Sequence, residues 1–288
     1  DYRIGNISYY TLTAGKNPGR FLKMGEIILI ETQWFLRRLA YGCDMIWYPT
    51  DRIKEWDSQR GLIHKNTVTT SCGVVDSLQV CQNVKKSKDK RRLCYIGQLT
   101  DLAGISLVLE SLVILKKYIT DVHLIIIGGG SLSIGKYKDL AENLGISEQV
   151  SFLGYVPDTN EAIRIMSECS LGLALFKPVV NNVSLYTEPT KVKDYIKAGI
   201  PVVITNIGPD VRFEIRRFDC GILVEFEKDK VARALAEVLS SEEKYERLLR
   251  GVPKFAEFFD YRERFSELCD RFDDELSKLP EIRKNIKL

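Results

Sequence analysis

Short apolar runs alternate with amphipathic stretches along most of the chain, from about residue 92 onward. The apolar runs predict the strands Leu93 to Ile96, Leu124 to Ile127, Val150 to Leu153, Leu171 to Leu175, Val202 to Thr205 and Ile222 to Val224. Strands that are short and almost wholly apolar are typical of a parallel sheet that is covered on both faces.

The amphipathic stretches between these runs predict helices. Apolar residues recur near the helical period in Leu102 to Lys117. Further helices are predicted at Tyr137 to Leu144, Thr159 to Ser167, Lys191 to Lys197 and Lys230 to Leu239. Strands that alternate with helices build βαβ units, so we expect an α/β, Rossmann-like domain over residues 89–258.

The segments on either side of this domain have different patterns. Residues 1–88 contain a helical stretch at Thr32 to Tyr41 and strands at Met45 to Tyr48 and Thr67 to Ser71, which is too little for a complete sheet domain. We therefore expect a partial N-terminal domain, and a chain that starts at Asp1 without Met suggests an excerpt. Residues 259–288 are expected to form terminal helices, with Pro253 marking the break before them.

Composition narrows the classes of function. The 288 residues carry 42 basic and 39 acidic side chains, a near-balance that gives no reason to expect nucleic acid as a partner. Seven scattered cysteines form no CxxC pair, so we expect neither a disulfide framework nor a zinc site, and a reducing, cytoplasmic setting. Of two histidines, His123 lies in an apolar run and is expected in the core, which leaves metal and His-based triad chemistry unsupported.

The sequence offers two further hints about location. No apolar stretch reaches the roughly 20 residues that span a bilayer, so no transmembrane segment is expected. A basic stretch, comprising Lys85, Lys86, Lys88, Lys90, Arg91 and Arg92, is either a solvated linker or a peripheral contact with an anionic membrane.

Two glycine loops follow predicted strands at their carboxyl ends, where open α/β sheets bind ligands. In the first loop, Gly97 and Gln98 precede a helix, and a glycine there lets backbone amides approach a pyrophosphate. In the second, Gly128 and Gly129 give a permissive backbone that suits a structural turn or one side of a ligand site equally well.

A third loop, Tyr186 to Lys191, leads into a predicted helix that Pro189 and Thr190 open. Lys191 in the first turn opposes the helix dipole, so its position is unfavourable unless an anion binds there. Asp194 lies three residues later on the same face and is suited to accept hydrogen bonds from a ribose diol. A solvated Lys–Asp pair is the plainer alternative.

With these loops in place, the segment Tyr95 to Val224 resembles the donor-binding domain of GT-B glycosyltransferases, in particular the family 4 group. The most specific match is Pro189 to Val203, which resembles that family's donor-site helix and the following strand. Val150 to Pro157 resembles the segment that holds the nucleobase, which assigns Tyr155 and Val156 to the nucleotide site. Asp44 to Ile46 and Gly73 to Asp76 resemble the last elements of the N-terminal Rossmann domain, to which the family's terminal helix crosses back.

The chain departs from the family pattern at charged positions. The family usually has an arginine after the first glycine and a lysine before the next helix, where this chain has Gln98 and Ala103. The family's pair of glutamates falls on Tyr186 and Asp194, and we assign Glu188 as the substitute for the first. Three lysines are available to replace the missing charges: Lys177, Lys191 and Lys193.

The resemblance implies transfer of a sugar from a UDP- or GDP-sugar to a glycan, lipid or other acceptor, with retention of configuration. Lys191 and Glu188 would then be the catalytic residues, and no cofactor or obligatory metal is expected. Two alternatives stay open: a non-catalytic partner subunit that has lost the donor chemistry, and an epimerase of the same architecture, which the two histidines disfavour.

Overall fold

The computed structural model describes residues 32, 35, 36, 38, 39 and 41–277, apart from 72, 74, 84–90, 180–181 and 207–209. The chain divides into two compact units, Cys72–Arg264 and a smaller one formed by Asp1–Ser71 with Phe265–Leu288. Within the described part of the chain, no helix is both long and apolar enough to cross a membrane.

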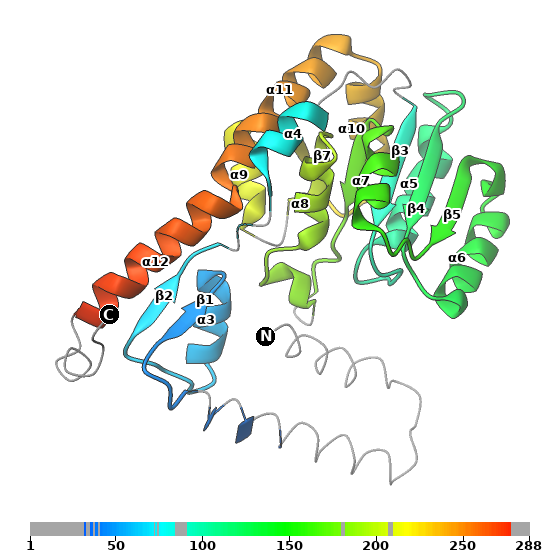
Figure 1. Ribbon diagram of the computed structural model, residues 1–288. Helices are drawn as coiled ribbons and strands as arrows, with labels where there is room; N and C mark the ends of the chain where they lie inside the picture. Colours follow the sequence, from blue (N-terminus) through cyan, green and yellow to red (C-terminus); the bar gives the residue numbers. More distant parts are fainter. Residues whose placement is uncertain are drawn as a thin grey trace, which may run out of the picture. The chain divides into compact units, whose positions relative to one another are not determined.

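The larger unit is built on a six-stranded parallel sheet with strand order β5-β4-β3-β6-β7-β8 (Figure 1). The strands are β3 (Arg92–Ile96), β4 (His123–Ile127), β5 (Val150–Gly154), β6 (Leu171–Ala174), β7 (Val202–Thr205) and β8 (Gly221–Val224). Counted within this unit the order is 3-2-1-4-5-6, the doubly wound order of a Rossmann fold. The topological switch point of the sheet therefore lies between β3 and β6.

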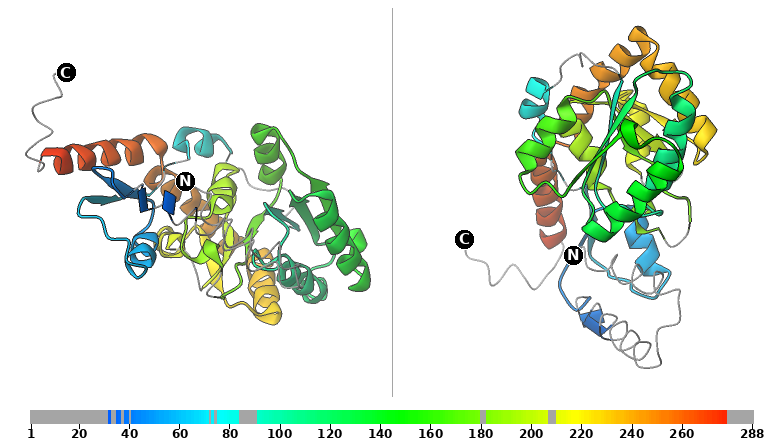
Figure 2. Two further views of the ribbon diagram at one scale, coloured as in Figure 1. Left: turned by 90° about the horizontal axis from the view of Figure 1, so that it is seen from below. Right: turned by 90° about the vertical axis from the view of Figure 1, so that its right-hand side faces the viewer.

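Helices cover both faces of this sheet (Figure 2). They are α4 (Ser77–Asn83), α5 (Ile105–Leu115), α6 (Ser131–Asn143), α7 (Thr159–Ser167), α8 (Thr190–Lys197), α9 (Val211–Phe218), α10 (Lys228–Leu239) and α11 (Glu242–Phe258). Short 3-10 turns are η1 (Ser147–Gln149) and η2 (Val183–Leu185). The final helix, α12 (Tyr261–Ser277), begins in this unit and continues into the smaller one.

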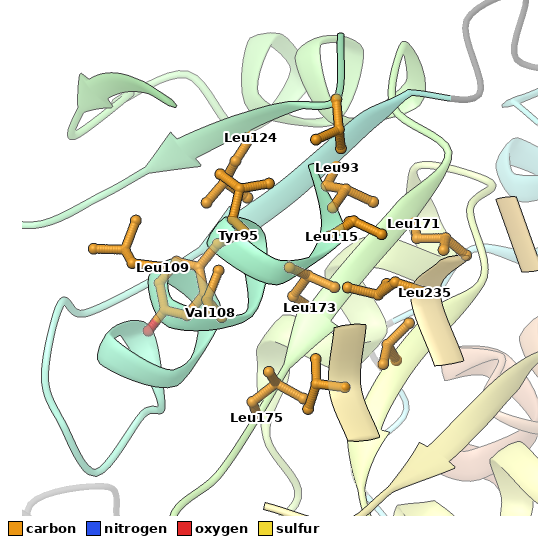
Figure 3. Packing of buried hydrophobic residues seen from close by; sticks show 14 of the residues in the cluster. Leu93, Tyr95, Val108, Leu109, Leu115, Leu124, Leu171, Leu173, Leu175 and Leu235 are labelled. Carbon is orange, nitrogen blue, oxygen red and sulfur yellow. The ribbon is translucent and has the colours of Figure 1, made fainter. Parts of the chain in front are cut away.

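Successive side chains along each strand point to opposite faces of the sheet, so the larger unit has two hydrophobic layers. On β3, Leu93 and Tyr95 point into the layer of α5, α6 and α10, part of which is drawn in Figure 3. Cys94 points into the opposite layer, with α4, α7, α8 and α9. α11 contributes to both layers. The helices that follow β3 and β6 thus lie on opposite faces, which is what opens a crevice at a switch point.

The predicted strands of the larger unit are confirmed to within a residue at each end. α7 matches its predicted range, and α8 begins one residue earlier than expected, at Thr190. α6 begins at Ser131, well before the predicted Tyr137. The prediction that Pro253 breaks the chain before the terminal helices is wrong, because Pro253 lies inside α11.

The smaller unit contains a two-stranded parallel sheet of β1 (Ile46–Tyr48) and β2 (Thr67–Thr69), together with α3 (Asp51–Ser58). Thr50 caps α3 by accepting a hydrogen bond from the Ile53 amide at 3.2 Å. The described residues from 32 to 39 are helical, as expected.

Candidate functional site

Lys191 lies at the switch point of the sheet. It stands in the first turn of α8, and its Nζ lies 4.2 Å from the centre of the Tyr95 ring on β3 and 5.3 Å from that of Phe176, which follows β6. A Cβ placed on Gly97 would be 3.9 Å from the same nitrogen. The ammonium group therefore packs against the first glycine turn instead of extending into bulk water.

The environment of this nitrogen is apolar. Nζ is buried and has no hydrogen-bond partner among the described residues, and burial lowers the pKa of Lys191 to about 7. A buried hydrogen-bond donor without a partner lowers the stability of the fold, and a charged donor lowers it more. The attraction of the charge to the faces of the aromatic rings offsets only part of the hydration energy that burial removes. An anion at the carboxyl end of the sheet would stabilise the charged lysine.

The two glycine turns touch each other beside this lysine. Gly97 and Gly128 both have positive φ, at 118° and 113°, and a Cβ on Gly128 would lie 2.3 Å from the Gly97 carbonyl oxygen. The Gly97 amide donates to Ile127 O on β4 at 2.9 Å, and the Gly128 amide donates to Gly154 O on β5 at 2.6 Å. The structure thus uses Gly97 and Gly128 to bring the turns together, while Gln98 and Gly129, one residue on, have amides that bond to no described residue.

The loop after Gly97 is fixed by a polar network. Asp101 accepts hydrogen bonds from Ser106 Oγ at 2.5 Å and Tyr137 OH at 3.0 Å, and forms an ion pair with Lys136 at 3.2 Å. Burial raises the pKa of the Asp101 carboxyl, but these hydrogen bonds outweigh it and the pKa is lowered. The first loop is therefore held in one conformation by α5 and α6.

A buried asparagine joins this loop to the one that follows β6. Asn182 is 2% exposed, and its Nδ2 donates to the carbonyl oxygens of Leu102 at 2.8 Å and Lys177 at 2.9 Å. The Lys177 amide also donates to Leu102 O, at 3.0 Å. Asn182 was absent from the predicted site because it lies in a loop without periodicity or a recognisable motif.

Tyr155 and Val156, assigned to the nucleobase, follow the end of β5 beside the second glycine turn. Tyr155 is 76% exposed, whereas Val156 packs against the hydrophobic layer of α8. An aromatic side chain that stands in solvent next to two glycine turns offers a face for stacking. The role of both residues in base binding stays a prediction.

Glu188 has a partner within the fold. Its carboxylate accepts a 2.8 Å ion-paired hydrogen bond from Lys193, which is 2% exposed and lies over the Phe259 ring. Lys193 is therefore engaged inside the layer of α8 and does not offer its charge to a phosphate. The assignment of Glu188 as a catalytic residue remains a prediction.

The remaining assigned residues line the same end of the sheet. Asp194 Oδ1 pairs with Lys197 at 3.3 Å on α8, and burial raises the pKa of its carboxyl. Thr190 is exposed at the start of α8, and Gln98 is exposed on the first loop. Lys177 is exposed in the loop after β6, so it remains available for an anion.

Other sequence predictions concern residues outside this site. His123 is partly buried, and its Nε2 lies 2.8 Å from Ser151 Oγ, so the ring is satisfied within the sheet. Across the described ranges, no group of three His, Cys, Asp or Glu side chains is arranged to hold a metal ion. Most of the basic stretch, Lys85 to Lys90, falls outside the described residues.

Comparison with known proteins identifies the family. The family model described as "Glycosyl transferases group 1" matches residues 80–254, which is more than half of the chain and includes all the loops above. A search of curated proteins finds no match.

Solved structures share the fold. The Anabaena protein HepE, solved with UDP and glucose, superimposes with a TM-score of 0.67 at 14% identity, covering 82% of this chain and 66% of HepE. A glycosyltransferase from Rickettsia africae gives a TM-score of 0.65 at 13% identity, covering 81% and 64%. The pneumococcal O-GlcNAc transferase GtfA, solved with UDP and GlcNAc, gives 0.62 at 18%, covering 81% and 45%.

These similarities have a defined extent. The chain spans about two thirds or less of each of these proteins, and the low identities establish the fold alone. The fold is the GT-B type that the resemblance implied, and the match to the family model covers the six-stranded sheet, so the chain belongs to the glycosyl transferases group 1 family.

Proposed function

We propose that this protein transfers a sugar from a UDP-sugar to an acceptor hydroxyl, and that Lys191 holds the donor's diphosphate. The observation that carries the proposal is the buried Lys191 Nζ, which lies at the switch point against Gly97. Open α/β sheets bind ligands at this point, and phosphates are favoured beside helix N-termini and glycine turns. The solved complexes of HepE and GtfA with UDP support uridine as the base.

In the proposed arrangement, each part of the donor contacts its own group of site residues. The diphosphate lies between Lys191 and the amides of Gln98 and Gly129, the ribose reaches Asp194, and the base stacks on Tyr155. Thr190, at the start of the same helix, adds a hydroxyl beside the phosphates. Val156, one residue beyond Tyr155, is partly buried against the layer of α8, and its backbone faces the base in this arrangement.

The proposed chemistry is leaving-group stabilisation. As the bond between the anomeric carbon and the β-phosphate oxygen breaks, negative charge develops on the departing diphosphate, and Lys191 with the loop amides stabilises it. The acceptor oxygen bonds to the anomeric carbon, and its proton passes to the departing diphosphate. Retention of configuration, Glu188 as a sugar contact, a glycan or lipid acceptor and independence from metal ions are parts of this proposal.

Calorimetry tests the donor site directly. UDP-glucose and GDP-glucose are titrated into the full chain, into Lys191→Ala and into Lys138→Ala, an exposed lysine of α6 that serves as the control. We expect binding of the uridine nucleotide to the wild type and the control, and loss of most affinity in Lys191→Ala. Equal affinity in Lys191→Ala would show that the donor site has been assigned to the wrong residues. Repeating the titration with a chelator tests whether donor binding is independent of metal ions.

The second candidate is a non-catalytic partner that keeps the fold. It is favoured by Gln98 and Ala103, which stand where the family resemblance places two cations, and by the engagement of Lys193 with Glu188. Charge-assisted bonds to phosphate contribute about 1.5 to 3 kcal/mol each, so their loss weakens a donor site strongly. A thermal-shift screen without any response to UDP, GDP or their sugars would favour this second function.

A further inference from the structure

Lys191 is held in an unusual way for a lysine in an anion site. Its Nζ lies over two aromatic rings, 4.2 Å from the Tyr95 centre and 5.3 Å from the Phe176 centre, and has no hydrogen-bond partner among the described residues. A lysine that binds anions from solvent would normally keep its ammonium group hydrated. Here the amine is withdrawn into a cradle formed by Tyr95 of β3 and by Phe176, which follows β6.

The acidic groups around this cradle are already paired. On α8 and the loop before it, Asp194 pairs with Lys197 and Glu188 with Lys193. On the first loop, Asp101 pairs with Lys136. None of these carboxylates therefore serves as the counter-ion of Lys191.

The phenols around the cradle are also bonded within the fold. The Tyr95 hydroxyl donates to Gln98 O at 2.6 Å, and the Tyr195 hydroxyl donates to Leu173 O at 2.8 Å. Burial raises the pKa of both phenols well above the ordinary range, so they stay neutral. Lys177, which follows β6, is exposed.

We propose that Lys191 takes up a proton from solution when the diphosphate of a nucleotide sugar binds, so that donor affinity at this site depends on pH. This inference rests on the proposed function and concerns how the same site is charged. Without a counter-ion among the described residues, the cradle favours the neutral amine, in agreement with the pKa of about 7 that burial gives Lys191. A diphosphate supplies the missing negative charge and restores the preference for the ammonium form.

The direction of the effect follows from linkage. The folded protein without ligand begins to lose the Lys191 proton near pH 7, whereas the complex holds it to higher pH. Binding is therefore accompanied by proton uptake above that pH, and the dissociation constant increases by up to about tenfold for each pH unit. Below pH 6, where the amine is charged in both states, affinity is expected to be independent of this group.

Proton uptake is measured by calorimetry in two buffers with different ionisation enthalpies. UDP-glucose is the probe, because its diphosphate is esterified at both ends and does not titrate near neutral pH. At about pH 8 we expect the wild type to take up close to one proton per nucleotide sugar bound. In Lys191→Arg, whose guanidinium stays charged, uptake should be close to zero, whereas the control Lys138→Arg should behave as the wild type.

Each result has a defined meaning. Binding without proton uptake in the wild type overturns this inference and leaves the proposed function intact. Uptake that persists in Lys191→Arg also overturns it, since another group, such as Asp194, is then the source. Absence of any binding overturns the proposed function together with this inference.

A second measurement does not depend on the arginine being accommodated. With lysines labelled by ¹³C at Cε, the resonance that disappears in Lys191→Met is titrated with and without UDP-glucose. A midpoint near 7 that moves upward with ligand supports the inference. A midpoint at the ordinary lysine value in the free protein overturns it.

Discussion

The ammonium nitrogen of Lys191 lies 4.2 Å from the centre of the Tyr95 ring, and the two residues come from elements on either side of the switch point of the sheet. The ring face attracts the charged amine by about 0.5 to 2 kcal/mol, which is less than the hydration that burial removes. The free protein therefore holds Lys191 in a destabilised state. Replacing this residue should separate stability from binding.

Lys191→Met should stabilise the free protein by about 1–3 kcal/mol, because an unsatisfied buried donor is replaced by an apolar side chain of similar length. The folded pKa of about 7 lies below the ordinary 10.5, so the unfolded chain binds more protons between these values. The stability advantage of Met should therefore be largest below pH 7 and decrease as the pH increases toward 10.5.

Denaturant unfolding at about pH 6 and about pH 9 measures this difference. The same variant should lose the thermal stabilisation that UDP-glucose gives the wild type. A Met variant that is less stable than the wild type at both pH values would contradict the buried, unpaired state of Lys191.

Gly128→Ala should destabilise the protein by more than about 2 kcal/mol and abolish nucleotide binding. At this position φ is 113°, and a Cβ would lie 2.3 Å from the carbonyl oxygen of Gly97, so the two turns would have to separate. Gly135→Ala is the matched control: it lies within α6 with no heavy atom within 4 Å of its Cβ position.

In the control, the gain in helix propensity should raise stability by about 0.5–1 kcal/mol. Thermal unfolding of both variants, with and without UDP-glucose, makes the comparison. Retention of nucleotide binding by Gly128→Ala would mean that the contact between the turns is not needed for the site.

The sequence predicted the sheet well because its strands are buried on both faces and read as apolar runs. α6 was harder, since its first turns contain Leu132, which is 91% exposed, and Gly135, so no apolar period begins before Tyr137. The prediction of a break at Pro253 failed because of tertiary packing. Burial of Val252 and Phe255 on either side offsets the roughly 3 kcal/mol that a proline costs inside a helix.

The sequence grouped the candidate site residues without their contacts. Gly97, Gly128 and Lys191 were grouped because their loops lie at the carboxyl ends of predicted parallel strands, and the structure brings the three residues together. The cradle of Tyr95 and Phe176 depends on β3 and β6 being neighbours, which no local pattern reveals. Likewise, the Glu188–Lys193 ion pair forms because α8 buries Lys193, whereas the sequence analysis offered Lys193 as a charge for the diphosphate.

Asn182 provides a test of how the two loops are held together. Asn182→Ala removes the donor shared by Leu102 O and Lys177 O and should lower the free energy of unfolding by about 1–3 kcal/mol. Asn182→Asp should cost more, because a carboxylate would face two carbonyl oxygens and has no proton to donate. Asn143→Ala, at the exposed end of α6, serves as the control with little expected effect.

Chemical denaturation of the three variants gives the order of stabilities, and titration with UDP-glucose gives the effect on the site. We expect affinity to fall in parallel with the loss of the loop contact. If Asn182→Asp proved as stable as the wild type, the amide would not be acting as a donor to these carbonyls.

Asp260 should control stability in acid. Arg262 donates to its carboxylate through Nε at 2.9 Å and Nη2 at 2.8 Å, and the Ser77 amide donates to it at 2.9 Å. Asp260 therefore ties the start of α4 to the start of α12. These hydrogen bonds, those of Arg262 above all, hold the pKa of Asp260 far below its ordinary value of 3.8. A depressed carboxyl pKa contributes stability above the ordinary value, and this contribution is lost as the pH falls below it.

Asp260→Asn should therefore be less stable than the wild type at about pH 7 by about 1–3 kcal/mol, and the difference should diminish at about pH 3. Asp121→Asn is the control, because Asp121 forms an exposed ion pair with Arg91 at 3.3 Å that contributes little. Urea unfolding across this pH range separates the two. Protonation removes only the stability that the ionised carboxylate contributes. If Asp260→Asn were less stable than the wild type by the same amount at neutral pH and at pH 3, the loss would therefore come from packing.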